Sequence, residues 1–74
     1  MTARELMEEL EWAIEQNGEE VEVRIAQQPK WAFEYSIRSA VTAQPAAGEE
    51  SVVYLEEGSQ LGYLPQGASE ELGW

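Results

Sequence analysis

The chain has 74 residues and a formal net charge of −11; it has no cysteine or histidine, and all fifteen acidic residues are glutamates. This length predicts one small acidic domain, residues 1–74, with a thin core. Four Lys and Arg residues are too few to bind phosphates, which argues against nucleic-acid and anionic-membrane partners. No apolar run is long enough to span a bilayer. Without a cysteine pattern or a secretory leader, we expect a cytoplasmic protein.

An amphipathic helix is predicted at the N-terminus. Thr2 and Glu5 have the capping-box spacing, which places Thr2 at the helix N-cap. Asn17 and Gly18 supply the C-terminal stop. One face of this helix is apolar and consists of Ala3, Leu6, Met7, Leu10, Ala13 and Ile14.

Two strands joined by a turn are predicted next. From residue 19 the hydrophobic period changes to two, which indicates a half-buried strand through residue 25. The sequence QQPK at 27–30 breaks the pattern, and residues 31–39 resume it. We expect one face of this second strand to lie in the core: Trp31, Phe33, Tyr35 and Ile37.

The register of this hairpin is also predictable from charge. Pairing Arg24 with Glu34 places Glu20 opposite Arg38, so opposite charges meet on the outer face. The same pairing brings the apolar residues together on the inner face. A slip of one residue would exchange the two faces.

Two further strands are predicted in the second half of the chain. Residues 42–50 have the composition of a loop, and 51–57 form a third strand that ends at the turn signal Gly58-Ser59. Residues 60–65 predict a short fourth strand, and 66–74 a tail with one helical turn from Ser69. The predicted fold class is α+β, with the N-terminal helix packed on a three- to four-stranded antiparallel sheet.

Aromatic residues in this half have predicted positions as well. Tyr54 and Tyr63, on neighbouring predicted strands, are expected to pack as a pair. Trp74 either docks back on the thin core or lies free. Lys30 and the two glutamines before Pro29 are expected to form an exposed hairpin tip that can touch a partner.

Three segments resemble a known group of sequences. They are TARELMEEL (2–10), EEVEVRIAQQPKWAFEYSI (19–37) and VVYLEEGSQLGYLP (52–65). Together they are similar to a group of short uncharacterised proteins from bacteria and their phages. The resemblance implies a mobile-element origin, which favours a role in host interaction or counter-defence. It carries over no catalytic residue.

Residue types needed for common enzyme chemistry are missing. Without histidine, cysteine or aspartate, the chain cannot build the usual nucleophile arrangements or structural zinc sites. The glycines are scattered singly, so there is no phosphate-binding loop. Adjacent glutamates diverge on helices and strands, which is poorly suited to an acid–base pair. We expect no enzymatic activity, no metal site and no cofactor.

A partner-binding surface is predicted on the helix instead. Trp12 falls about 160° from the middle of the apolar face, among carboxylates. The candidate binding residues are Trp12, Glu5, Glu8, Glu9, Glu11 and Glu15. Carboxylates at this helical spacing, about 5–6 Å apart, resemble successive phosphates of a nucleic-acid strand. The alternatives are that Trp12 is covered by the sheet, the tail or a second protomer, and that the glutamates only keep the protein soluble.

These features lead to two functional hypotheses. The first is a phage-type acidic inhibitor, of the anti-CRISPR or anti-restriction kind, that imitates phosphate charge and binds a basic nucleic-acid-handling host protein in the host cytoplasm. The second is an accessory or regulatory interaction module whose partner is not a nucleic-acid binder. A homodimer that buries Trp12 is a third, structural outcome.

Overall fold

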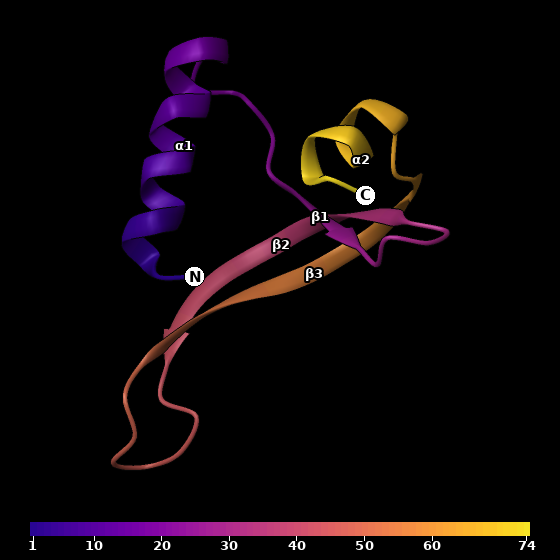
Figure 1. Cartoon of the computed structure of the whole chain (residues 1–74). Coiled ribbons are helices and arrows are strands. Elements are labelled where there is room, and N and C mark those ends of the chain that lie inside the picture. The colour runs from indigo at the N-terminus through magenta and orange to yellow at the C-terminus, as the bar shows by residue number, and fades with distance from the viewer.

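The computed structural model describes residues 1–74 and has an α+β fold, with two helices and one three-stranded antiparallel sheet (Figure 1). The strand order is β1-β2-β3, so each strand pairs with its neighbour in the sequence. The predicted fold class is confirmed, with three strands. The elements are α1 (Ala3–Asn17), β1 (Arg24–Gln27), β2 (Phe33–Ala43), β3 (Val52–Tyr63) and α2 (Gln66–Leu72).

Helix α1 begins and ends where its sequence predicts. The Thr2 hydroxyl oxygen accepts a hydrogen bond from the Glu5 backbone N–H at 3.1 Å, which satisfies one of the unpaired donors of the first turn. Gly18 ends the helix with φ at 91°, and its N–H donates to the Ile14 carbonyl at 2.7 Å. Both predicted termini are confirmed.

The hairpin of β1 and β2 has a different register from the predicted one. Arg24 lies opposite Ser36, two residues further along β2 than Glu34. An even shift leaves the same side chains on the same faces, so the predicted pattern of faces survives the error. The predicted pairing of Glu20 with Arg38 is wrong: β1 begins only at Arg24, and Arg38 lies 3.9 Å from Glu56 instead.

Strand β3 is continuous through Gly58, where the sequence predicted a turn and a fourth strand. Its register against β2 shifts near this point, which marks an irregular, bulged segment. The Ser59 N–H donates to the Ser36 hydroxyl at 2.9 Å, and a Cβ atom on Gly58 would collide with that hydroxyl oxygen. Gly58 therefore permits a close approach between strands and does not form a turn.

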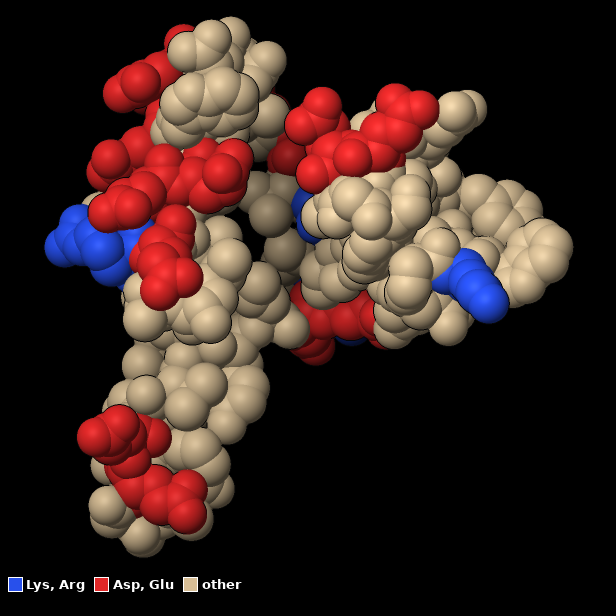
Figure 2. Space-filling view, in the orientation of Figure 1, with Lys and Arg blue, Asp and Glu red and all other residues tan.

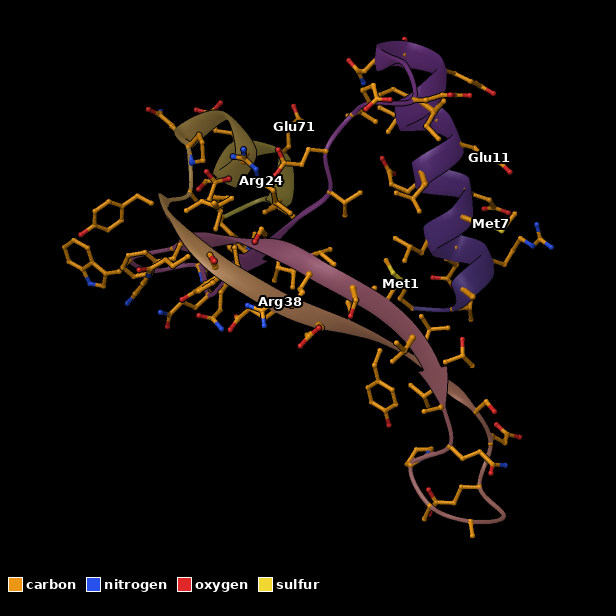
Figure 3. All side chains as sticks on the ribbon, turned by 180° about the vertical axis from the view of Figure 1, so that it is seen from behind. Met1, Met7, Glu11, Arg24, Arg38 and Glu71 are labelled. Carbon is orange, nitrogen blue, oxygen red and sulfur yellow. The ribbon has the colours of Figure 1, made fainter.

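Both helices lie on the same side of the sheet (Figures 1 and 3). An open groove between α2 and the sheet is lined by Arg24, Ala26 and Glu34 together with Ala68 and Leu72. Strand alternation places Phe33 on the opposite face from Glu34. At this end of the sheet Phe33 therefore points away from the α2 groove, and the register shifts further along β2 prevent the same alternation from assigning faces to the rest of the strand.

The sequence predicted a thin core, but no residue of the chain is fully buried. Trp31, predicted to be in the core, is 80% exposed; Phe33, Tyr35 and Ile37 are half-buried. The Phe33 ring stacks on Tyr63 with the centroids 4.9 Å apart. The predicted pairing of Tyr63 with Tyr54 is wrong because both residues belong to β3.

The C-terminal segment contains more helix than the single turn expected from Ser69. Helix α2 begins at Gln66, directly after Pro65, and Gly73 ends it in the left-handed conformation. The Trp74 N–H donates to the Ser69 carbonyl at 2.8 Å, and the Trp74 ring lines the groove beneath α2. Trp74 thus folds back on the domain. None of the helices has the length and apolar character that a membrane crossing requires.

Candidate partner-binding surface

The outward side of α1 carries the densest negative charge of the molecule. We call this surface the acidic face, and its residues are Glu5, Glu8, Glu9, Glu11, Glu15 and Trp12. All six are exposed. Figure 2 shows acidic side chains gathered over α1, with smaller groups over α2 and at the loop that joins β2 to β3. The predicted site residues therefore form one continuous surface on one helix.

The orientation of α1 follows from its apolar side. Leu6 and Leu10 line an open groove with Val53 and Leu55 of β3. The same two leucines line a second groove with the segment that leads into β1, including Val21. Because the apolar side is turned toward the rest of the chain, the acidic face points into solvent.

The carboxylates of the acidic face have no cationic partners. The three ion pairs of the structure involve Glu22, Glu34 and Glu56, all outside α1. Arg4 is the only basic residue on α1, and it forms no ion pair. The charge of the helix is therefore not neutralised within the chain, and it creates a field that attracts cationic surfaces.

Trp12 lies in the middle of this charge. Its helical neighbours are Glu8 at i−4, Glu9 at i−3 and Glu15 at i+3. The side chain is 58% exposed, so neither the sheet nor the C-terminal tail covers it. Its display on the single chain is confirmed, while its role as an anchor stays a prediction.

Carboxylates beside the sheet, unlike those of the acidic face, have a cationic partner. Arg24 donates hydrogen bonds from Nε to Glu22 at 2.9 Å, from Nη2 to Glu22 at 3.2 Å, and from Nη1 to Glu34 at 3.0 Å. The hydrogen bonds from Arg24 and its positive charge lower the pKa of Glu22, and the two carboxylates raise the pKa of Arg24. Figure 3 shows Arg24 beneath α2 and Arg38 on the other side of the sheet. The carboxylates beside Arg24 are thus paired within the chain and are not free to bind a partner.

The tip of the β1–β2 hairpin is exposed, as predicted for Lys30 and the two glutamines, but it also includes Trp31, which the sequence placed in the core. Gln28 and Trp31 both have positive φ, 50° and 54°, so the tip has an unusual backbone. Trp31 is 80% exposed and Tyr63 is 69% exposed. The sequence feature that indicates the exposure of Trp31 is its position directly after Pro29 and Lys30, because a turn can hold a side chain away from the sheet.

The structure combines an exposed acidic helix face with open grooves beside both helices. No group of three or more acidic side chains is placed to hold a metal ion. The grooves beside α1 and α2 are open and mostly apolar. Comparisons with protein-family models, curated proteins and solved structures find no match. The resemblance to the bacterial and phage group therefore stays an expectation.

Proposed function

We propose that this chain is a protein-binding domain that presents the acidic face of α1 to a basic partner. The observation that carries the proposal is that the carboxylates of this face have no cationic partner, while those beside Arg24 are paired. A helix covered with unpaired carboxylates around an exposed tryptophan is suited to a cationic surface that can neutralise it.

The specific form that we propose is inhibition of a nucleic-acid-handling protein. Carboxylates spaced about 5–6 Å apart along α1 can occupy the sites where a basic groove binds successive phosphates. Arginines of such a groove can pair with Glu8 or Glu15 and stack on the indole of Trp12. The acidic face then competes with nucleic acid for the groove, as expected of an anti-CRISPR or anti-restriction inhibitor from a mobile element.

One observation favours the alternative function, an accessory module whose partner does not bind nucleic acid. Trp31 and Tyr63 are the most exposed aromatic side chains. Trp31 belongs to the β1–β2 turn and Tyr63 ends β3, and Figure 1 shows this end of the sheet away from α1. Large exposed aromatic rings are common anchors in protein interfaces. If this end binds the partner, affinity depends on Trp31 and only weakly on salt.

The experiment that separates the two functions is a capture from host lysate with matched tryptophan variants. Wild-type protein, Trp12→Ala and Trp31→Ala are immobilised, and retained proteins are identified after washing at about 50 mM and about 500 mM salt. A second series adds double-stranded DNA or RNA as competitor. The proposed inhibitor retains a nucleic-acid-binding protein that is lost with Trp12→Ala, with high salt and with competitor.

The remaining outcomes are equally informative. Loss with Trp31→Ala alone, without an effect of salt or nucleic acid, supports the accessory module and contradicts mimicry. If the same proteins are retained by all three versions regardless of salt, or none is retained, the acidic face only keeps the domain soluble and the proposal is wrong.

A further inference from the structure

The far end of the β2–β3 hairpin projects from the body of the molecule (Figure 1). We call residues 40–43 of β2 and 52–55 of β3 the arm; they pair with each other in continuous register. All eight residues are exposed, and none carries a charge. The arm is the longest two-stranded part of the sheet without a charged side chain.

Both faces of the arm are apolar. Residues opposite each other in an antiparallel pair share a face, so Val41 and Tyr54 lie on one face, and Val53 with Thr42 on the other. The helix-side face contacts only the first turns of α1, across an open groove. Val41 is 54% exposed, and no element of the chain covers its face. An antiparallel sheet normally has one covered face and one polar face, and the arm has neither.

The surface area of the chain shows how much of it is uncovered. The accessible area is 6151 Å², whereas a compact monomer of 8.3 kDa exposes about 4,600 Å². The excess, roughly 1,500 Å² for the whole chain, shows that its elements pack loosely and leave much surface uncovered, the arm included. The radius of gyration agrees: it is 14.2 Å, against about 11 Å for a compact chain of this length.

The open edges of the arm fit a second copy of the same strands. β1 pairs with β2 only as far as Ser36, so the outer edge of β2 from Ile37 to Ala43 has no strand partner. Natural edge strands are usually protected by charges or prolines among other devices, and residues 39–43 carry neither a charge nor a proline. A two-fold axis relates identical strands in antiparallel orientation, so such an edge is self-complementary.

We propose that the arm is the interface of a symmetric homodimer, with the arm of a second copy of this chain covering it. Charge selects this occupant: each copy carries −11, so two copies can approach only through a surface that has no charge. A basic partner has no carboxylate to bind on the arm. The dimer leaves the acidic face and Trp12 exposed on both copies, so this proposal is independent of the proposed function.

The test is the mass of the full chain in solution, measured by light scattering and sedimentation over a roughly thousandfold concentration range. The wild type is expected at twice 8.3 kDa, with more dimer as salt screens the repulsion between copies. Val41→Lys reduces the negative charge yet places an ammonium group in the interface. It is expected to raise the dissociation constant at least about a hundredfold.

Two further variants control for folding and for charge. Val41→Thr keeps the β-branched shape and the strand propensity, and it is expected to weaken the dimer by about tenfold. Trp12→Lys makes the same change of charge on the acidic face and is expected to leave the dimer intact. A wild type that is monomeric at every concentration overturns the proposal. So does a Val41→Lys variant that dimerises like the wild type, or a dimer that only Trp12→Lys dissociates.

Discussion

Arg24 and Glu34 form an ion pair at 3.0 Å although they are not opposite each other in the sheet. Arg24 lies opposite Ser36, so the guanidinium reaches Glu34 diagonally across the two strands. The Glu34 side chain is only 13% exposed, on the face that α2 covers. The pair therefore joins the short edge strand β1 to β2 beneath a helix.

Removing the guanidinium should destabilise the domain more than removing the exposed Arg38. Arg24→Gln leaves the Glu34 carboxylate, which is only 13% exposed, without a cation, and it should therefore lower the free energy of unfolding. Arg38 pairs with Glu56 at 3.9 Å, and both side chains are exposed, so Arg38→Gln should cost less than about 0.5 kcal/mol. Urea denaturation at one protein concentration measures both. If both variants lose the same free energy of unfolding, the diagonal ion pair contributes no more to stability than the exposed one.

Glu22 should titrate below the ordinary glutamate pKa of 4.5, because Arg24 donates hydrogen bonds to its charged form. A lowered pKa in the folded state contributes stability above the unfolded value, and this contribution is lost as pH falls through the folded value. Carbon-13 NMR of the Glu22 carboxyl should give a midpoint below 4.5, and Arg24→Gln should raise it toward that value. Arg38→Gln is the control and should leave it unchanged. A midpoint that Arg24→Gln does not move contradicts the assignment.

The two glycines Gly58 and Gly67 should respond in opposite directions to the same substitution. Gly58→Ala pushes a Cβ atom against the Ser36 hydroxyl, which then cannot accept the Ser59 N–H, and should cost about 1–3 kcal/mol. Gly67 lies in α2 with open space around it, so Gly67→Ala should stabilise the domain by about 0.5–1 kcal/mol. Thermal unfolding of the two variants provides the comparison. If Gly58→Ala leaves the stability unchanged, the two strands must be able to move apart at this point.

The display of Trp12 can be followed by fluorescence. With Trp31→Phe and Trp74→Phe in place, Trp12 is the only tryptophan. At 58% exposure it should emit at long wavelength and be quenched by acrylamide, equally at high and low protein concentration. The reason is that a dimer built through the arm leaves α1 free. A blue-shifted emission that is lost on dilution would place Trp12 in the dimer interface.

Local signals in the sequence predicted the local structure well. The termini of α1 follow from the capping hydroxyl of Thr2 and from Gly18 with its positive φ, both of which act within one helical turn. Strand alternation placed Phe33 and Glu34 on opposite faces as predicted, and the QQPK turn separates β1 from β2 as predicted. These features depend on neighbours a few residues apart.

Features that depend on distant contacts were predicted less well. Gly58 resembles a turn residue in the sequence, but its role depends on Ser36, which is far away along the chain. The register error arose because a long arginine can pair diagonally, so opposite charges do not fix the alignment. The sequence of β2 alone does not show which face of the sheet the helices cover. Trp31, for example, is as hydrophobic as a core residue, but it lies in solvent.

If the unpaired carboxylates of α1 bind the partner, their removal must weaken binding more than the removal of the same charge elsewhere on the chain. Glu8→Gln with Glu15→Gln removes two charges beside Trp12, and Glu49→Gln with Glu50→Gln removes two charges at the β2–β3 loop. The measurement is the affinity of each double variant for the protein retained by the wild type, over a series of salt concentrations. We expect weaker binding and a shallower salt dependence for the α1 variant, with the loop variant close to wild type. Equal losses of affinity for both variants would mean that only net charge matters and that the acidic face is not the binding surface.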